Sequence, residues 1–144
     1  MTLDDITYKI NGAVFEVNRV LGGGLLEKIY ENALLKELRS HGLEANSQVP
    51  LEVTYKGETM GEYAVDILVE KCVILELKAV DQLQKVHEAQ LINYLKATGL
   101  NVGPLINFKH PKADIKRFVL DLPEGHDALG ADRSSAPSSA CVCG

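Results

Sequence analysis

Apolar positions spaced three and four residues apart recur through the first forty residues of the chain. The first set on one helical face is Ile6, Ile10, Val14 and Val17. Thr2 and Asp5 have the spacing of an N-terminal capping box, so we expect a helix over about 4–20. The run "LGGG" breaks this pattern. A second helix is then expected over about 25–41, because Gly42 is a typical C-terminal stop.

The pattern changes to β-type after the second helix, and five strands are expected. They span about 49–55, 58–69, 72–79, 102–108 and 114–122. The first two are expected to form a hairpin that turns at Lys56 and Gly57. Pro104 predicts either an edge position or an irregular start for the fourth strand, because proline has no N–H to give to a sheet.

A third helix is expected over about 83–97, with Asp81 as its N-cap and Gly99 as its end. The resulting order of elements, ααβββαββ, predicts an α/β fold with a mixed central sheet flanked by helices. We expect one domain over residues 1–122. Residues 123–144 contain almost no large apolar residues and are expected to form a disordered tail.

Composition is that of an ordinary soluble protein, with 46% hydrophobic and 24% charged residues. No apolar stretch approaches the ~18 residues of a membrane span, so no membrane partner is expected. The polar N-terminus does not resemble a secretory signal, and three cysteines predict no disulfide framework. We therefore expect a cytoplasmic protein.

The net charge of −5 argues mildly against indiscriminate binding to nucleic acid. The charge is uneven, however, because the segment "KHPKADIKR" (109–117) gathers four basic residues around one acid. This segment is either a solvated loop and strand edge or a patch that faces phosphates.

An acid and a base interrupt the apolar run "CVILELKAV" (72–80). Glu76 and Lys78 are two residues apart and share one face of the expected strand, and Asp66 lies on the strand before it. Converging carboxylates suit Mg²⁺ or Mn²⁺, which polarise a phosphodiester and activate water. The alternative is that Glu76 and Lys78 form the solvated face of an edge strand.

The pairing of the two strands decides whether these residues can converge. Asp66 lies opposite Glu76 only if Val69 pairs with Val73, which requires a three-residue loop. A two-residue turn would place Asp66 opposite Leu75 instead. Neither loop contains the glycine that such turns favour, so both registers stay open.

Two helices carry further candidates. Glu27 and Tyr30 are three residues apart on the second helix, and His87, Gln90 and Tyr94 form one stripe of the third helix. Alternatively, Glu27 is a surface carboxylate beside a half-buried Tyr30. The stripe on the third helix would then consist of polar groups at a helix edge.

Together these segments resemble the bacterial GxxExxY proteins of the PD-(D/E)XK nuclease superfamily. The resemblance covers roughly residues 5–120 and rests on these five motifs: "GLLEKIY", "GEYAVDILVE", "VILELKAV", "HEAQLINYLKATGL" and "VGPLINF". It implies a restriction-endonuclease-like core. The sequence departs from the superfamily pattern at Val65, where a proline often stands, and at Ala64, where many relatives have a basic residue.

The resemblance also implies roles for individual residues. Asp66, Glu76 and Lys78 would be catalytic. Metal ligands would be Glu27, Asp66, Glu76 and the backbone carbonyl of Leu77. Residues that support the site or contact substrate would be Tyr30, His87, Gln90 and Tyr94.

These residues predict a Mg²⁺- or Mn²⁺-dependent nuclease that hydrolyses phosphodiester bonds in DNA or RNA. One alternative is a non-catalytic nucleic-acid-binding module on the same fold. The other is a protein-interaction domain whose exposed sheet edge recruits a partner or a second copy of the chain, which would make a homo-oligomer.

Overall fold

The computed structural model describes residues 1–109 and 111–120. The helices are α1 (Leu3–Leu21), α2 (Glu27–Ser40) and α3 (Lys85–Thr98). The strands are β1 (Ala45–Tyr55), β2 (Glu58–Val69), β3 (Val73–Lys78), β4 (Val102–Asn107) and β5 (Asp114–Val119). The predicted order ααβββαββ and the predicted α/β class are confirmed. The expected tail at 123–144 and the last residues of the final strand, 121–122, lie outside the described residues.

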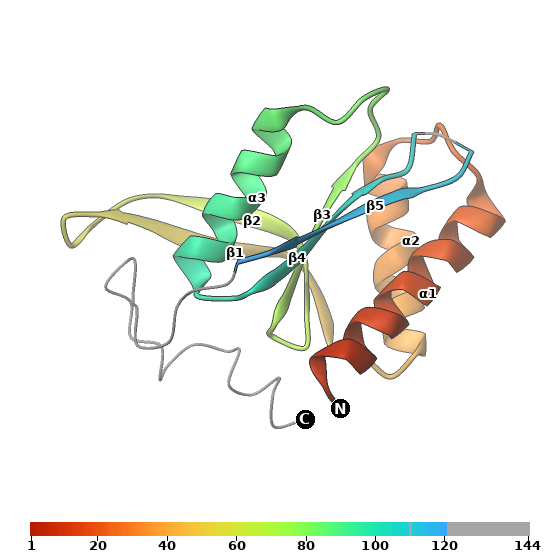
Figure 1. The fold of residues 1–144 in the computed structure, drawn as a ribbon, viewed down its shortest axis with the longest axis horizontal. Coiled ribbons are helices and arrows are strands. Elements are labelled where there is room, and N and C mark those ends of the chain that lie inside the picture. The colour runs from red at the N-terminus through yellow and green to blue at the C-terminus, as the bar shows by residue number, and fades with distance from the viewer. Residues whose placement is uncertain (110, 121–144) are drawn as a thin grey trace.

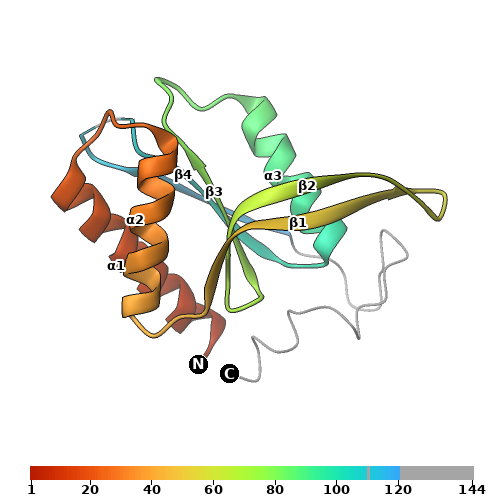
Figure 2. The ribbon, with the colours of Figure 1, turned by 180° about the vertical axis from the view of Figure 1, so that it is seen from behind.

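The five strands form one mixed sheet in the order β1-β2-β3-β4-β5. Neighbouring strands are antiparallel except β3 and β4, which are parallel. A parallel pair needs a crossover connection, and α3 supplies it. Figures 1 and 2 show α2 crossing one face of the sheet and α3 lying against the other. The β1–β2 hairpin extends beyond the body of the molecule, and α3 lies beside its base.

The core surrounds β3 and β4, which are buried along almost their whole length because helices cover both faces. Gly103 of β4 shows how closely α3 packs. A Cβ atom at this position would lie 2.8 Å from Leu91 Cδ1 and 3.2 Å from the carbonyl oxygen of Ile74. Few polar side chains are buried in this core, and Glu76 of β3 is one of them.

Pro104 does not mark an edge strand, since β4 lies between β3 and β5. The other expectation, an irregular start, describes the strand better. The β3–β4 register passes from the Val73–Val102 pair directly to the Glu76–Leu105 pair. The missing N–H of Pro104 falls in this interruption, so β4 tolerates the proline inside the sheet.

Several local predictions are confirmed, and one is wrong. Thr2 caps α1 through a reciprocal capping box, and Lys56 and Gly57 form the hairpin turn with positive φ angles of 50° and 83°. The N-cap of α3 is Gln84, which has an extended backbone conformation, rather than Asp81. Cys72 is buried and disulfide-bonded. No helix in the described ranges is long and apolar enough to cross a membrane.

Candidate active site

The loop between β2 and β3 sets the register on which the site depends. Val69 pairs with Val73, so the connection is the three-residue loop Glu70-Lys71-Cys72. Glu70 and Lys71 both adopt the left-handed conformation, with φ angles of 52° and 57°. The chain thus makes this loop without glycine, and of the two open registers it adopts the one that brings Asp66 opposite Glu76.

The backbone ladder between β2 and β3 ends at the Ile67–Leu75 pair, and side chains take over its hydrogen bonds. The N–H of Leu77 donates to Asp66 Oδ2 over 2.7 Å. The N–H of Asp66 donates to Glu76 Oε1 over 3.3 Å. Each carboxylate is therefore fixed by the backbone of the opposite strand, and the two acids converge where the strands separate.

Burial and mutual repulsion act on this pair of acids. Glu76 is only 5% exposed, and its burial, followed by the charge of Asp66, raises the pKa of its carboxyl from 4.5 to about 8. Burial, followed by the charge of Glu31, raises the pKa of Asp66 as well, despite the N–H of Leu77. The surrounding protein therefore does not fully compensate two negative charges at this position, and Glu76 keeps its proton below about pH 8.

Glu27 and Lys78 complete the electrostatic cluster. The positive charge of Lys78 lowers the pKa of Glu27, Asp66 and Glu76, although burial outweighs it and raises each pKa overall. In the described part of the chain Lys78 forms no direct salt bridge. Its ammonium group is thus near all three carboxylates while keeping its own hydrogen-bonding capacity for a ligand.

Tyr30 explains how the glycine-rich turn presents Glu27. The Tyr30 hydroxyl donates to the carbonyl of Gly22 over 2.7 Å and accepts from the N–H of Leu25 over 3.0 Å. Its ring is fully buried and stacks on Phe108, with 4.4 Å between ring centres. Tyr30 therefore joins the turn to the sheet and holds the start of α2, where Glu27 is the first helical residue.

The residues predicted on α3 divide into two groups. Tyr94 is buried, and burial followed by the charge of Glu76 raises its pKa to about 12, so its hydroxyl stays protonated beside the acids. Gln90 lies one turn earlier on the same side of α3. His87 instead accepts a hydrogen bond at Nδ1 from the N–H of Gln84 over 3.1 Å, which caps the helix. A role for His87 in substrate binding stays a prediction.

Three polar residues at the site were missed by sequence reasoning. Gln48 of β1 donates through its Nε2 to Glu31 Oε1 over 2.7 Å and lies 3.5 Å from Asp66 Oδ1. Glu31 is buried and also pairs with Lys28. Its position four residues after Glu27 could have indicated a shared helical face. No sequence signal points to Gln48, which adopts a left-handed φ of 53° inside a strand.

Asn107 is the third missed residue, and it fixes the chain just after Lys78. Its amide accepts from the N–H of Val80 over 3.1 Å and donates to the carbonyl of Val80 over 2.8 Å. The N–H of Phe108 donates to the carbonyl of Lys78 over 2.9 Å. Asn107 at the end of β4 and the following Phe108 thus hold the backbone on both sides of Ala79.

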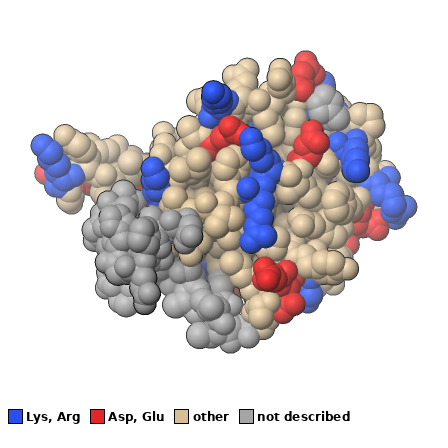
Figure 3. All heavy atoms as spheres, viewed as in Figure 1, with Lys and Arg blue, Asp and Glu red and all other residues tan. Residues whose placement is uncertain are grey.

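The basic segment at 109–117 belongs to the edge strand β5 and the loop before it. Figure 3 shows basic side chains in a band across β5. Lys116 pairs with Glu88, and Lys109 pairs with Asp81 at 3.7 Å. Acidic neighbours therefore offset part of the charge, and both interpretations of this segment stay open.

The donor set suits a hard divalent cation, because the carboxylates of Glu27, Asp66 and Glu76 and the carbonyl of Leu77 are all oxygen donors. The side chains are not gathered into a coordination sphere: the described residues contain no group of three His, Cys, Asp or Glu arranged to hold a metal ion. Asp66 and Glu76 are instead engaged by backbone N–H groups. Charge and chemistry therefore fit a cation, and the assignment of ligands stays a prediction.

Comparison with known proteins places the chain in a family. The model of the PD-(D/E)XK nuclease superfamily matches residues 4–118, so the chain belongs to this superfamily. No curated protein matches it. Among solved structures, the fold is similar to the crystal structure of SSO0001, with a TM-score of 0.53 and 19% sequence identity. That alignment covers 67% of this chain and 51% of that one, so the chain spans about half the length of SSO0001. At this identity the likeness concerns the fold alone.

Proposed function

We propose that the protein is a Mg²⁺- or Mn²⁺-dependent nuclease that hydrolyses phosphodiester bonds in DNA or RNA. Membership of the PD-(D/E)XK nuclease superfamily supports the reaction class. The observation that carries the proposal is the pair of reciprocal hydrogen bonds that brings Asp66 and Glu76 together beside Lys78. The GxxExxY motif at Gly24, Glu27 and Tyr30 supports assignment to the subgroup named for it.

Glu27, Asp66, Glu76 and the carbonyl of Leu77 would hold the cation, by exchanging present hydrogen bonds for coordination. When bound, such an ion polarises the phosphodiester and lowers the pKa of a water molecule. It would also stabilise the ionised forms of Glu76 and Asp66, whose pKa values are raised by burial and then by neighbouring negative charges.

Lys78 has a role other than metal binding. Its ammonium group donates hydrogen bonds and lies among the acids without a direct salt bridge in the described residues. We assign it to orienting the attacking water and to stabilising the negative charge that develops on the phosphate. Gln90 and Tyr94 border the site from α3 and would brace the substrate strand.

The test is a digestion assay with labelled single- and double-stranded DNA and RNA, in Mg²⁺, Mn²⁺ or EDTA. Wild-type protein should cleave at least one substrate in a metal-dependent manner. Lys78→Met keeps the length of the side chain but removes its charge, and should reduce cleavage by about 10²-fold or more. Lys85→Met, on the exposed first turn of α3, is the matched control and should cleave normally. Metal-independent cleavage, or equal activity of the two variants, would refute the proposal.

A further inference from the structure

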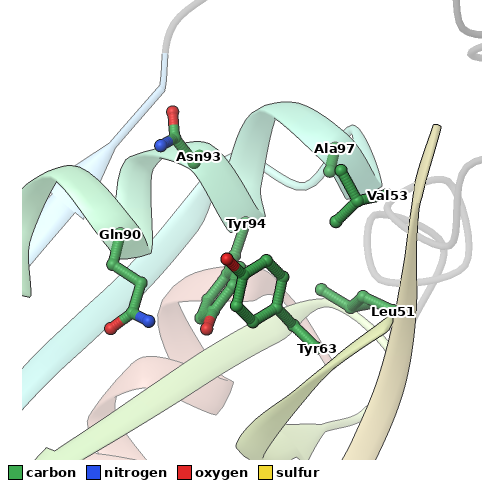
Figure 4. Close-up of a pocket in the computed structure, with 7 residues that line it drawn as sticks. All are labelled: Leu51, Val53, Tyr63, Gln90, Asn93, Tyr94 and Ala97. Atoms are coloured by element: carbon green, nitrogen blue, oxygen red, sulfur yellow. The ribbon is translucent and has the colours of Figure 1, made fainter. Parts of the chain in front are cut away.

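A pocket of about 280 Å³ lies between the β1–β2 hairpin and α3. Figure 4 shows side chains from both elements facing each other across it. The lining residues are Leu51, Val53, Tyr63, Gln90, Asn93, Tyr94 and Ala97. None of them is charged, so the pocket favours a neutral group over a phosphate.

Two tyrosine rings form the most distinctive wall of the pocket. The rings of Tyr63 and Tyr94 are tilted by 57°, with 5.5 Å between their centres. Tyr94 is buried, whereas Tyr63 is 51% exposed and offers a free ring face. In Figure 4 the amide of Gln90 extends beside Tyr94. The pocket therefore combines an aromatic surface with a hydrogen-bonding group at one end, which suits a flat ligand with polar edges.

The hairpin separates its apolar side chains from its charged ones. Leu51 pairs with Tyr63, whereas the next pair, Glu52 with Glu62, points to the opposite face. The face toward α3 is therefore free of the hairpin's carboxylates. A nucleic-acid strand could approach this wall with a base, without bringing its phosphates against the two acids.

The pocket also adjoins the candidate active site. Tyr63 precedes Asp66 by three residues on β2, about 10 Å along a strand, and alternation puts the two side chains on opposite sides of β2. Tyr94 belongs to both the pocket and the candidate active site. It lines the pocket, and the charges of Glu76 and Asp66 act on its hydroxyl. Through Tyr94, a group held against Tyr63 could belong to the same substrate molecule as a phosphodiester at the carboxylates.

We propose that this pocket binds an unpaired nucleobase of single-stranded DNA or RNA, which stacks on Tyr63 next to the phosphodiester to be cut. The inference rests on the proposed function and adds the substrate class. Bases in a duplex are already stacked and paired, and extruding one is costly. Single strands present free base faces, which aromatic side chains bind with little regard to sequence. The protein should therefore prefer single strands to duplexes.

The experiment is fluorescence anisotropy with labelled single-stranded DNA, single-stranded RNA and duplex DNA in EDTA. Wild type should bind one of the single strands more tightly than the duplex. Tyr63→Ala should weaken that binding about tenfold, as expected for the loss of one stacked base. Tyr63→Phe keeps the ring and should bind within about twofold of wild type. Tyr55→Ala is the matched control, because Tyr55 is 61% exposed on the same hairpin but does not line the pocket.

The outcomes separate this inference from the proposed function. Equal affinity for single strands and duplex, or equal effects of Tyr63→Ala and Tyr55→Ala, would overturn the base pocket. The same holds if wild type binds no oligonucleotide. If single strands bind through Tyr63 but are never cleaved with Mg²⁺ or Mn²⁺, the pocket stands and the nuclease proposal fails. If cleavage occurs with the same kcat/KM in Tyr63→Ala, the nuclease stands and the pocket fails.

Discussion

The backbone N–H of Asp66 donates to the carboxylate of Glu76 over 3.3 Å, where the strands that carry these two residues begin to separate. In return, the N–H of Leu77 donates to Asp66 over 2.7 Å. The two acids thus replace backbone bonds that the sheet has lost. Because both are partly or fully buried, their repulsion is strong, and it grows as they ionise. The fold therefore holds this pair in place while leaving its charge for a cation to balance.

Stability in the absence of divalent ions should fall as the pH rises. The pKa of Glu76 is raised from 4.5 to about 8, so between these values the folded state holds a proton that the unfolded state has released. This stabilisation is complete below pH 4.5 and is lost as the pH rises through about 8. One such proton changes the free energy of unfolding by at most about 1.4 kcal/mol per pH unit. Urea denaturation in EDTA between about pH 5.5 and pH 8.5 measures the slope.

Glu76→Gln isolates the contribution of this residue to the slope. The amide keeps the shape of the side chain but cannot ionise, so the variant should lose less stability on going to high pH. Asp66 and Glu27 also have raised pKa values and leave a smaller slope of the same sign. Glu58→Gln, at the exposed start of β2, should behave like wild type. Identical slopes for Glu76→Gln and wild type would contradict the account.

Gln48 should help to hold the side chains of Glu31 and Asp66 in place. Gln48→Ala removes a hydrogen bond from buried Glu31 and should lower the free energy of unfolding by roughly 1 kcal/mol. Gln48→Gly removes the same bond but relieves the left-handed φ of 53°, so it should be more stable than the alanine variant. Chemical denaturation of the two variants shows which has the higher free energy of unfolding. A glycine variant no more stable than the alanine variant would show that the backbone at Gln48 is not strained.

Tyr30→Phe should loosen the turn that precedes α2. The substitution keeps the stacking on Phe108 but leaves the carbonyl of Gly22 and the N–H of Leu25 without the hydroxyl. The expected loss is about 1–3 kcal/mol, measured by urea denaturation. Tyr8→Phe, on an 80% exposed side chain of α1, serves as the control and should have no effect. Equal stability of the two variants would mean that the hydroxyl does not fix the turn.

Much of the fold could be predicted from the sequence, because hydrophobic spacing and local signals agree. The capping box at Thr2, the turn at Lys56-Gly57 and the end of α3 at Gly99 are local features, and the structure has all three. The position of Pro104 was harder to predict. Whether a strand is internal depends on which strands flank it, and the spacing of its own residues does not contain that information.

The site itself required the structure at two points. The register of β2 and β3 depends on left-handed conformations at Glu70 and Lys71, which ordinary residues rarely adopt. The bond between Gln48 and Glu31 joins residues 17 apart in sequence, from a strand and a helix. Such contacts arise from packing, and no spacing rule within one element predicts them. The converging acids Asp66 and Glu76 were predicted only on the condition that the three-residue loop forms.

The most direct test of the central claim is isothermal titration of Mn²⁺ into the wild-type protein, Asp66→Ala and Asp114→Ala. Asp114 is an exposed acid of β5 outside the cluster, so its variant controls for the loss of one charge. We predict that wild type and Asp114→Ala bind Mn²⁺ and that Asp66→Ala, shown to be folded by circular dichroism, does not. Absence of binding to folded wild type, or undiminished binding to Asp66→Ala, would contradict the assignment of Asp66 and Glu76 as the centre of a metal-dependent active site.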